Sequence, residues 1–283
     1  MKSNKDKLVC SAVCASIHHP TMPNNGYRIG YDGYGRITHG TGSITYNYKI
    51  GDSCMGIEGD HIEPGVSVKN ANQSENNAVQ FLSCIGNIAI VTSGEAKGSK
   101  GIVTGKHGGV DHTIIYFENN VLDKLNIDDK IKIKTFGLGY KLLDFKDVSV
   151  MNIDPDLLEK IITTDTKINI NVSTIIPSFL MGSGLGSNSN YAGDYDIMTQ
   201  DKEANSKFGI DTLRFGDIVA ISDHYCRNGA HFKKDYITIG VIVHSDSFTS
   251  GHGPGITTIM SAHKDNFNIK VGSSCNLIDF INK

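Results

Sequence analysis

The sequence predicts a mainly β protein with few, short helices, in which small β-barrel lobes are joined by a short helical connector. Short segments rich in β-branched residues recur along the 283-residue chain, and glycine, asparagine and aspartate bound them. Glycine is abundant, with 31 residues, whereas proline is scarce, with 6, which indicates many tight turns. Strands do not alternate with amphipathic segments of about 10–15 residues, so we do not expect a parallel sheet covered by helices.

The expected strands follow one another along the whole chain. The first is N-terminal, where alternation predicts one buried face made of Leu8, Cys10, Ala12 and Cys14. The other segments with strand character are residues 43–48, 85–91, 113–117, 130–134, 168–172, 218–221 and 237–244.

Helix signals are few and short. The best candidate spans residues 154–162, where an aspartate suits the N-cap, Pro155 suits the first helical position, and leucine and isoleucine side chains form one apolar stripe. A second short helix is expected near residues 121–125. The polar residues 69–78 are expected to form a loop that leads into a short helix.

The helical segment separates two β-rich halves, which we expect to be domains 1–145 and 146–283, with a compact small barrel at about 85–145. Residues 89–117 read as a strand, a lysine- and glycine-rich turn, a second strand, a loop and a third strand. This pattern resembles the KOW segment of SH3-like small barrels in ribosomal and transcription proteins, and Gly101 would let the second strand bend sharply. Barrels of this kind host many activities, so the resemblance concerns the fold.

The charge balance limits the possible partners. With 27 basic and 30 acidic residues the net charge is −3, which argues against a general nucleic-acid binder and a polybasic membrane-surface protein. No run of about 18 apolar residues could span a bilayer. Six scattered cysteines without a CxxC pair indicate reduced thiols. These observations favour a cytoplasmic protein without a membrane partner, and they disfavour nucleic acid. We expect the protein to form a homo-oligomer and to bind a small polar molecule.

Paired histidine and carboxylate residues are the candidate chemistry of this sequence. Asp-His dipeptides begin at residues 60, 111 and 223, and His244 precedes Asp246 by two positions. Imidazole and carboxylate groups bind transition metals and transfer protons near neutral pH. Any one such pair is ordinarily a capped, solvated turn, but four pairs in one chain, several of them beside glycines, favour a shared pocket.

We expect four segments to converge on one cleft: residues 60–63, His107, 194–196 and 244–252. The expected roles are catalytic for His61, Glu63 and Asp60, substrate-binding for His107, Gly182, Gly184, Gly186, Asp194 and Asp196, and metal-binding for His244, Asp246 and His252. The cofactor in this scheme is a divalent metal ion. In a metal-free alternative, His61 works with Glu63 as an acid–base pair, and the backbone amides of the GSGLG loop hold an anionic substrate.

Several motifs occur together in one order: GDHIEPGVS (59–67), GNIAIVTSGEAKGSKGIVTGKHGG (86–109), NIDP (152–155), GSGLG (182–186), GDYDI (193–197), LRFGDIVAI (213–221), and GVIVHSDS with GHGPG (240–255). Over roughly residues 15–262 the chain thereby resembles a family of conserved prokaryotic proteins described only as a domain of unknown function. The resemblance implies a mainly β, multi-lobed fold with small barrels, and it implies no reaction. The sequence departs from the family pattern near His39 and at residues 223–226, so no site residue is assigned there. Its use of glycine, aspartate and histidine is also similar to that of acetamidase/formamidase-type β proteins.

Three function classes remain open. The first is an enzyme of hydrolase or lyase type that acts on a small polar metabolite by metal-assisted or Asp/His acid–base chemistry. The second is a non-catalytic ligand-binding or scaffold oligomer, which would hold a ligand tightly without turnover. The third is a nucleic-acid or ribosome-associated KOW-like module, in which Lys97, Lys100 and Lys106 would form a basic stripe, although no aromatic residue for base stacking lies between them.

Overall fold

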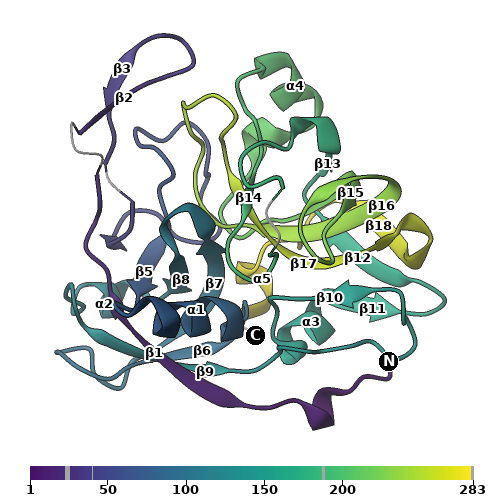
Figure 1. The fold of residues 1–283 in the computed structure, drawn as a ribbon, viewed down its shortest axis with the longest axis horizontal. Helices are drawn as coiled ribbons and strands as arrows, with labels where there is room; N and C mark the ends of the chain where they lie inside the picture. The colour runs from purple at the N-terminus through teal and green to yellow at the C-terminus, as the bar shows by residue number, and fades with distance from the viewer. Residues whose placement is uncertain (23–25, 40, 187–188, 282–283) are drawn as a thin grey trace.

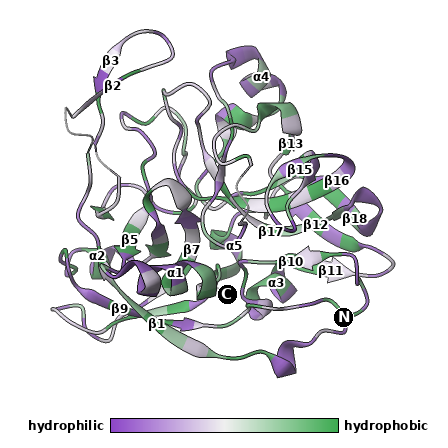
Figure 2. Cartoon of the chain, in the orientation of Figure 1, coloured by the Kyte–Doolittle hydropathy of each residue, from purple (hydrophilic) through white to green (hydrophobic). Residues whose placement is uncertain are grey.

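The computed structural model describes residues 1–22, 26–39, 41–186 and 189–281 (Figure 1). As predicted, the protein is mainly β, and its described helices are short. Figure 1 shows one large sheet in the N-terminal half and another in the C-terminal half, lying beside each other. Hydrophobic residues gather on the strands of both sheets (Figure 2).

The N-terminal sheet closes into a six-stranded barrel. Its strands are hydrogen-bonded in the order β1, β9, β6, β7, β8, β5, and β5 pairs back to β1. A short strand, β4 (Ile44–Thr45), extends the sheet from β5. The barrel strands are Ser11–Ile17 (β1), Gly65–Lys69 (β5), Ile88–Val91 (β6), Lys100–His107 (β7), His112–Tyr116 (β8) and Lys130–Thr135 (β9).

The predicted barrel is present, but it uses more of the chain than the expected 85–145. That segment supplies β6 to β9, an antiparallel set with two open edges. The strands β1 and β5, which come from residues 11–69, pair with these edges and with each other. Closure removes the exposed edges, which is the physical reason why the two earlier strands belong to the barrel.

The buried face of the first strand is the opposite of the predicted one. Val13, Ala15 and Ile17 are buried, whereas Cys10, Ala12 and Cys14 are exposed and Leu8 is half-buried. Strand β1 pairs with β9 in the register Val13↔Ile133 and Ala15↔Ile131, and those isoleucines fill the barrel. Opposed residues of an antiparallel pair point to one face, so the partner strand sets the orientation.

The C-terminal half contains the second large sheet, with β10, β17, β16, β15 and β13 in this order and β14 paired to β17. Its strands are Ser149–Val150 (β10), Ile175–Pro177 (β13), Tyr195–Asp196 (β14), Ile218–Tyr225 (β15), His231–Ile242 (β16) and Gly255–His263 (β17). A three-stranded sheet holds Ile162–Thr164 (β11), Ile168–Val172 (β12) and Phe267–Val271 (β18).

The hairpin of β2 (Tyr27–Ile29) and β3 (Gly35–Ile37), which belongs to the N-terminal half, projects from the body at the upper left of Figure 1.

The described α-helices are α1 (Gln73–Leu82), α2 (Asn119–Leu122), α3 (Pro155–Ile161), α4 (Lys202–Lys207) and α5 (Ile278–Ile281). Helix α3 forms as expected: the side chain of Asp154 accepts a hydrogen bond from the amide of Asp156, and Pro155 opens the helix. Helix α1 begins inside the polar segment 69–78, which was expected to be mostly loop: Asn72 caps it by accepting a hydrogen bond from the amide of Glu75, and the helix continues to Leu82. Within the described ranges, every helix is too short or too polar to cross a lipid bilayer.

One hydrophobic core joins the two halves. It packs Ile114 and Tyr116 of β8 together with Ile218, Val241 and Ile259 of the C-terminal sheet. A second core fills the barrel, and a third centres on the C-terminal sheet. The barrel and the C-terminal sheet therefore share apolar contacts, and their strand ends are held at fixed positions relative to one another.

Strand β7 approaches the C-terminal sheet very closely. A Cβ atom on Gly105 would lie 2.2 Å from Val243 Cγ1, so glycine is required for this approach. The next residue, Lys106, donates its amide to Thr257 Oγ1 at 3.1 Å, and the Thr257 hydroxyl donates to the Lys106 carbonyl at 3.1 Å. These contacts place His107, the last residue of β7, against the sheet.

Candidate metal centre

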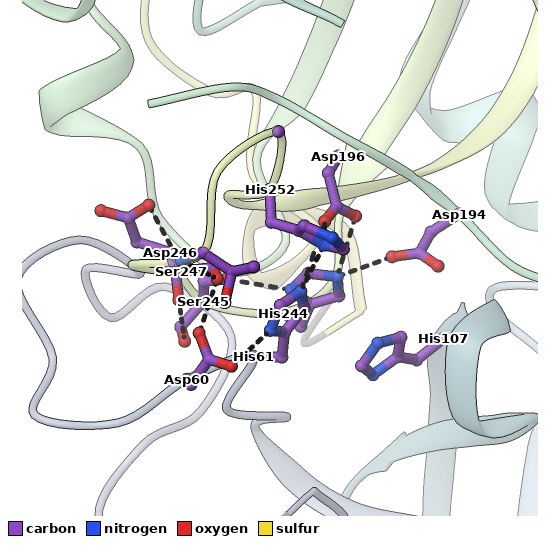
Figure 3. Close-up of polar contacts among 12 residues, drawn as sticks. Asp60, His61, His107, Asp194, Asp196, His244, Ser245, Asp246, Ser247 and His252 are labelled. Atoms are coloured by element: carbon purple, nitrogen blue, oxygen red, sulfur yellow. Dashed lines mark hydrogen bonds and ion pairs between the residues drawn. The ribbon is translucent and has the colours of Figure 1, made fainter. Parts of the chain in front are cut away.

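Strand ends and loops from both halves meet beside the contact between β7 and β17. The barrel half provides the loop before β5 and the end of β7, and the C-terminal half provides β14 and the two ends of the β16–β17 connection. The side chains that they bring together are His61, His107, Asp194, Asp196, His244 and His252 (Figure 3).

The four imidazole rings form one cluster. The ring centroid of His61 lies 5.7 Å from that of His107, 4.9 Å from that of His244 and 5.0 Å from that of His252. The centroids of His107 and His244 are 4.3 Å apart. The expected convergence of these segments is therefore seen in the structure, well within the two ligand shells of about 12 Å that a shared metal site would allow.

The cluster divides into two groups that could each hold a metal ion. One group is His61, Asp196 and His252, and the other is His107, Asp194 and His244. Within each group the donor atoms lie within 4.8 Å of one another. Two imidazoles and one carboxylate are a common donor set for catalytic zinc and related transition metals, with a further position left for a ligand.

Three of the imidazoles have one ring nitrogen bound by the protein. Glu63 Oε1 lies 2.6 Å from His107 Nδ1, and Asp60 Oδ2 lies 3.1 Å from His61 Nδ1. The carbonyl of Ser245 lies 2.9 Å from His244 Nδ1. An acceptor at Nδ1 holds the proton there and leaves Nε2 with a free lone pair, which is the arrangement of metal-ligating histidines.

Glu63 is a buried hub behind the cluster. Besides His107, its carboxylate binds His112 Nδ1 at 2.9 Å and accepts a hydrogen bond from the Ser67 hydroxyl. On its other side, His112 Nε2 lies 3.1 Å from His18 Nδ1. The sequence reasoning did not assign His112 or His18 to the site. The Asp111-His112 dipeptide was the available signal for His112, and the sequence offers no such signal for His18.

Two buried atoms at the centre of the cluster have polar partners only inside it. Asp194 Oδ2 and His244 Nε2 lie 2.7 Å apart as an ion pair, His244 Nε2 lies 3.5 Å from Asp196 Oδ1, and neither atom has a hydrogen bond from a described residue outside the cluster. The other oxygen of Asp194 accepts the amide of Gly108 at 2.8 Å, which fixes the carboxylate. Buried polar atoms left without hydrogen bonds are costly, and a cation between or beside these two atoms would satisfy both. The residues present therefore fit a metal ion.

The electrostatics of the cluster favour positive charge. Burial opposes the charged form of His244, but the carboxylates of Asp194 and Asp196 outweigh it and raise the pKa of His244 well above its ordinary value. Burial would likewise raise the pKa of Asp196, yet hydrogen bonds from His244, His252 and His61 hold that pKa below its ordinary value. A bound cation must displace these protons, so its affinity is expected to rise with pH.

The backbone of His61 is also unusual. Its φ angle is 55°, a left-handed conformation that residues other than glycine seldom adopt. The amide of His61 donates to the carbonyl of Asp246 at 3.3 Å. Such conformations persist where the surrounding structure holds them, and they concentrate at functional sites.

The structure places several of the expected site residues outside the two donor groups. Asp60 and Glu63, expected to be catalytic, lie behind His61 and His107, where they orient these rings. Asp246, expected to bind metal, accepts hydrogen bonds from the Thr199 hydroxyl and the Ser247 amide and belongs to neither group among the described residues. It therefore shapes the loop that carries His244, while His244 and His252 fall into different groups.

The GSGLG loop does not present the expected cradle of amides. The amides of Gly182, Ser183 and Gly186 donate to the carbonyls of Asp196, Gly251 and Ala230. Because these donors are used within the protein, Gly182 and Gly186 are unsuited to the predicted anion binding. Gly184 does line the cavity of the site.

Lys106 is likewise absent from any basic surface stripe. Its side chain is fully buried, and its ammonium group donates to Asn152 Oδ1 at 2.8 Å and to the Tyr191 carbonyl at 2.6 Å. The stripe expected from Lys97, Lys100 and Lys106 is therefore not formed. Lys100 and Lys106 lie an even number of residues apart on β7, but the bulge between Val103 and Gly105 reverses the alternation and turns Lys106 inward.

A cavity of about 390 Å³ opens onto the cluster. Its walls include every donor of the two groups except the fully buried His244, together with Gly108, Gly109 and Arg28. Arg28 lies on β2 of the projecting hairpin, with its Nη1 3.6 Å from Asp60 Oδ2, and the sequence reasoning missed it. An arginine at the wall of a cavity is suited to binding a carboxylate or phosphate group.

Comparison with known proteins identifies the family. Residues 27–159 match the N-terminal part, and residues 158–281 the C-terminal part, of a domain of unknown function named DUF4438. The chain belongs to the DUF4438 family. A solved structure described as "Crystal structure of TM1086" is 45% identical to this DUF4438 protein, covers 99% of each chain and superposes with a TM-score of 0.94. No curated protein matches the chain significantly.

Proposed function

We propose that this DUF4438 protein is a metal-dependent enzyme that hydrolyses a small polar metabolite. The observation that carries the proposal is the arrangement of His244 and Asp194: two buried donor atoms 2.7 Å apart, with no hydrogen bond from outside the cluster, beside imidazoles whose outer nitrogens are bound by the protein. Donors fixed from behind and placed beside a cavity are typical of a metal site that leaves a position for substrate.

In this proposal one set of residues binds the metal, and a second set orients the first. His61, His107, His244, His252, Asp194 and Asp196 would hold the metal. When bound, a divalent ion supplies Lewis acidity and makes water a stronger nucleophile near neutral pH. Asp60 and Glu63 keep His61 and His107 in the ring orientation that directs Nε2 inward, so no rearrangement of these rings is needed.

The cavity supports a small substrate that carries an anionic group. Its volume of about 390 Å³ lies in the lower part of the range for ligand pockets, which is roughly 300–1,000 Å³. Arg28 would bind the anionic group near the opening, and the wall at Gly108 and Gly109, which carries no side chains, would let the substrate approach the donors closely.

Turnover by the purified full-length protein tests the proposal. The protein is stripped with a chelator, reloaded with Zn²⁺, Mn²⁺ or Co²⁺, and assayed against small amides, esters and lactones, with and without a carboxylate group. We expect hydrolysis by the metal-loaded protein, no hydrolysis by the stripped protein, and loss of activity in His244→Ala. His263→Ala, which removes a half-exposed histidine outside the cluster, is the matched control and should keep full activity.

Two outcomes would contradict the proposal. Failure of the protein to retain any of these metals at micromolar concentration would remove its basis. Metal binding without hydrolysis of any compound in the panel would favour the non-catalytic ligand-binding alternative, especially if a small molecule remained bound during purification.

A further inference from the structure

We propose that the cluster holds two divalent cations side by side, with the carboxylate of Asp196 as the bridge between them. This inference rests on the metal site of the proposed function and adds the number of ions and the role of one residue. Single-ion sites in proteins use about three or four protein donors, whereas six donor side chains meet here in two groups of three.

The two groups are in contact. The rings of His61 and His107, one from each group, stack with an interplanar angle of 11° and a centroid distance of 5.7 Å. His61 also lies 4.9 Å from His244 of the other group. Ions bound to the two groups would therefore be neighbours, as in two-metal hydrolytic sites, where the ions are roughly 3.5–4 Å apart.

Asp196 extends one oxygen toward each group. Its Oδ2 lies 2.9 Å from His252 Nδ1 and 3.3 Å from His61 Nε2, the two imidazoles of its own group. Its Oδ1 lies 3.5 Å from Nε2 of His244, in the other group. A carboxylate placed in this way can bind one ion through each oxygen. Asp194 is two residues away on the same strand face, but it contacts His244 alone among these rings.

The charge of the site matches two divalent ions better than one. Asp194 and Asp196 are donors, and Asp60 and Glu63 bind the rings from behind, which gives four buried carboxylates and a summed charge of −4. Two divalent ions supply +4. The arginine beside Asp60 has a side chain that is 46% exposed, so solvent screens its contribution. A single ion would balance half of this negative charge and leave the rest to the imidazole groups that contact the carboxylates, whereas two ions balance all of it.

A glycine lets the donors of the second group lie directly against strand β17. A Cβ atom on Gly255 would lie 2.0 Å from Asp194 Oδ2 and 2.3 Å from His244 Nε2. Gly255 is also the residue that pairs with Asp196 across β14 and β17. Any side chain here would displace the two donor atoms, so glycine is required for Asp194 and His244 to meet at this point.

The number of ions and their interaction test the inference. The stripped full-length protein is titrated with Zn²⁺ and its metal content is measured by mass spectrometry after removal of free ions. We expect two Zn²⁺ per chain in the natural sequence and in the control His263→Ala, and one per chain in His252→Ala. With Co²⁺, the low-temperature paramagnetic resonance signal per ion should fall when the second equivalent binds, because a carboxylate bridge couples the two spins.

Substitution of the bridge gives the sharper result. In Asp196→Asn, we expect affinity for the second ion to fall at least tenfold and the spin coupling to disappear. If this variant does not fold, as judged by circular dichroism, the stoichiometry and coupling of the natural protein decide alone. One ion per chain at saturation, or two uncoupled ions, would overturn the two-ion centre while leaving a metal-dependent hydrolase intact. No bound ion at all would overturn both proposals.

Discussion

A histidine ring can offer a metal only the nitrogen that the protein leaves free. In this site the choice is made one layer behind the cavity, by a carboxylate at His107, a carboxylate at His61 and a main-chain carbonyl at His244. These partners also stop the rings from turning about their side-chain bonds. The rings therefore lose their conformational entropy when the protein folds, and metal binding does not have to order them.

Replacing Glu63 by glutamine should weaken metal binding without unfolding the protein. The substitution keeps the size of this buried side chain but removes the charge that binds both His107 and His112. Loss of such a partner typically lowers metal affinity about 10–100-fold. Competition with a chromophoric chelator measures the change, and Glu118→Gln, near Tyr116 and outside the cluster, is the matched control. Unchanged affinity in Glu63→Gln would show that Glu63 does not position His107.

A second prediction concerns pH and His224, which is buried in β15. Burial, followed by the charge of His231, lowers the pKa of His224 to about 4, whereas an unfolded chain has a histidine pKa of about 6.5. Between these values the unfolded state binds more protons than the folded state. His224 therefore removes stability as pH falls from about 6.5 to about 4, by up to about 3 kcal/mol at roughly 1.4 kcal/mol per pH unit.

Urea denaturation at pH 7 and pH 5 measures this effect. The loss in free energy of unfolding between the two pH values should be smaller in His224→Asn than in the natural protein, by about 1–2 kcal/mol. The variant His263→Ala should show the natural dependence, because His263 is a half-exposed histidine. An identical pH dependence in His224→Asn would mean that His224 does not titrate in this way.

At the residue scale, the sequence predicted which residues meet. It did not predict which of them lie at the centre of the cluster and which lie behind these donors. Paired aspartates and histidines beside glycines predicted that His61, His107, His244 and His252 converge. The same pattern could not separate the donors from the residues behind them, because all of these acidic side chains carry the same carboxylate group. Only the folded structure shows that the carboxylates of Asp194 and Asp196 point to the centre of the cluster, whereas those of Asp60 and Glu63 contact the outer side of the rings. His112 on β8 and Arg28 on β2 come close to the cluster only in the folded protein, so the sequence alone did not indicate that they belong to the site.

At the scale of elements, β1 shows how a partner strand decides an orientation. The alternation around residues 8–14 correctly indicated a strand. The side chains in this segment are small and similar in polarity on both faces, so they did not determine which face is buried. The pairing with Ile131 and Ile133 of β9 decides it. Closure of the barrel by β1 and β5 was equally hidden, since the pairing joins segments about fifty residues apart and depends on the whole set of strands.

Truncation of one β1 residue should confirm which face is buried. Ile17 is fully buried in the barrel, so Ile17→Ala should lower the free energy of unfolding by about 2–5 kcal/mol. Cys14→Ala, on the exposed face of the same strand, should change it by less than about 0.5 kcal/mol. Chemical denaturation of both variants makes the comparison. A larger effect at Cys14 than at Ile17 would contradict the orientation described for β1.

At the scale of the whole molecule, the two halves share a hydrophobic core, and this should make them unfold together. The core packs Ile114 of the barrel with Ile218 and Val241 of the C-terminal sheet. Scanning calorimetry of the metal-free protein should show one transition, with calorimetric and van't Hoff enthalpies that agree. Tyrosine fluorescence, which is the available intrinsic signal because the chain has no tryptophan, should change at the same temperature. Two separate transitions would indicate independently stable halves.

Saturation with metal should raise the temperature of this transition, since the donors come from both halves and are dispersed in the unfolded chain. The rise should be smaller in His244→Ala, which loses one of the two donor groups, and unchanged in His263→Ala, and differential scanning fluorimetry measures both. An equal rise in His244→Ala would show that the stabilising metal binds elsewhere.

The distribution of the donors along the chain has a consequence for how the gene can evolve. His61 and His107 lie within residues 27–159, and the remaining four donors lie within residues 158–281. A gene that lost either segment would encode neither complete group, since each group takes one histidine from the first segment and two donors from the second. Gene fission or the shuffling of one half onto another protein would therefore separate the members of both groups, so the two segments must be inherited together for one chain to carry the complete cluster.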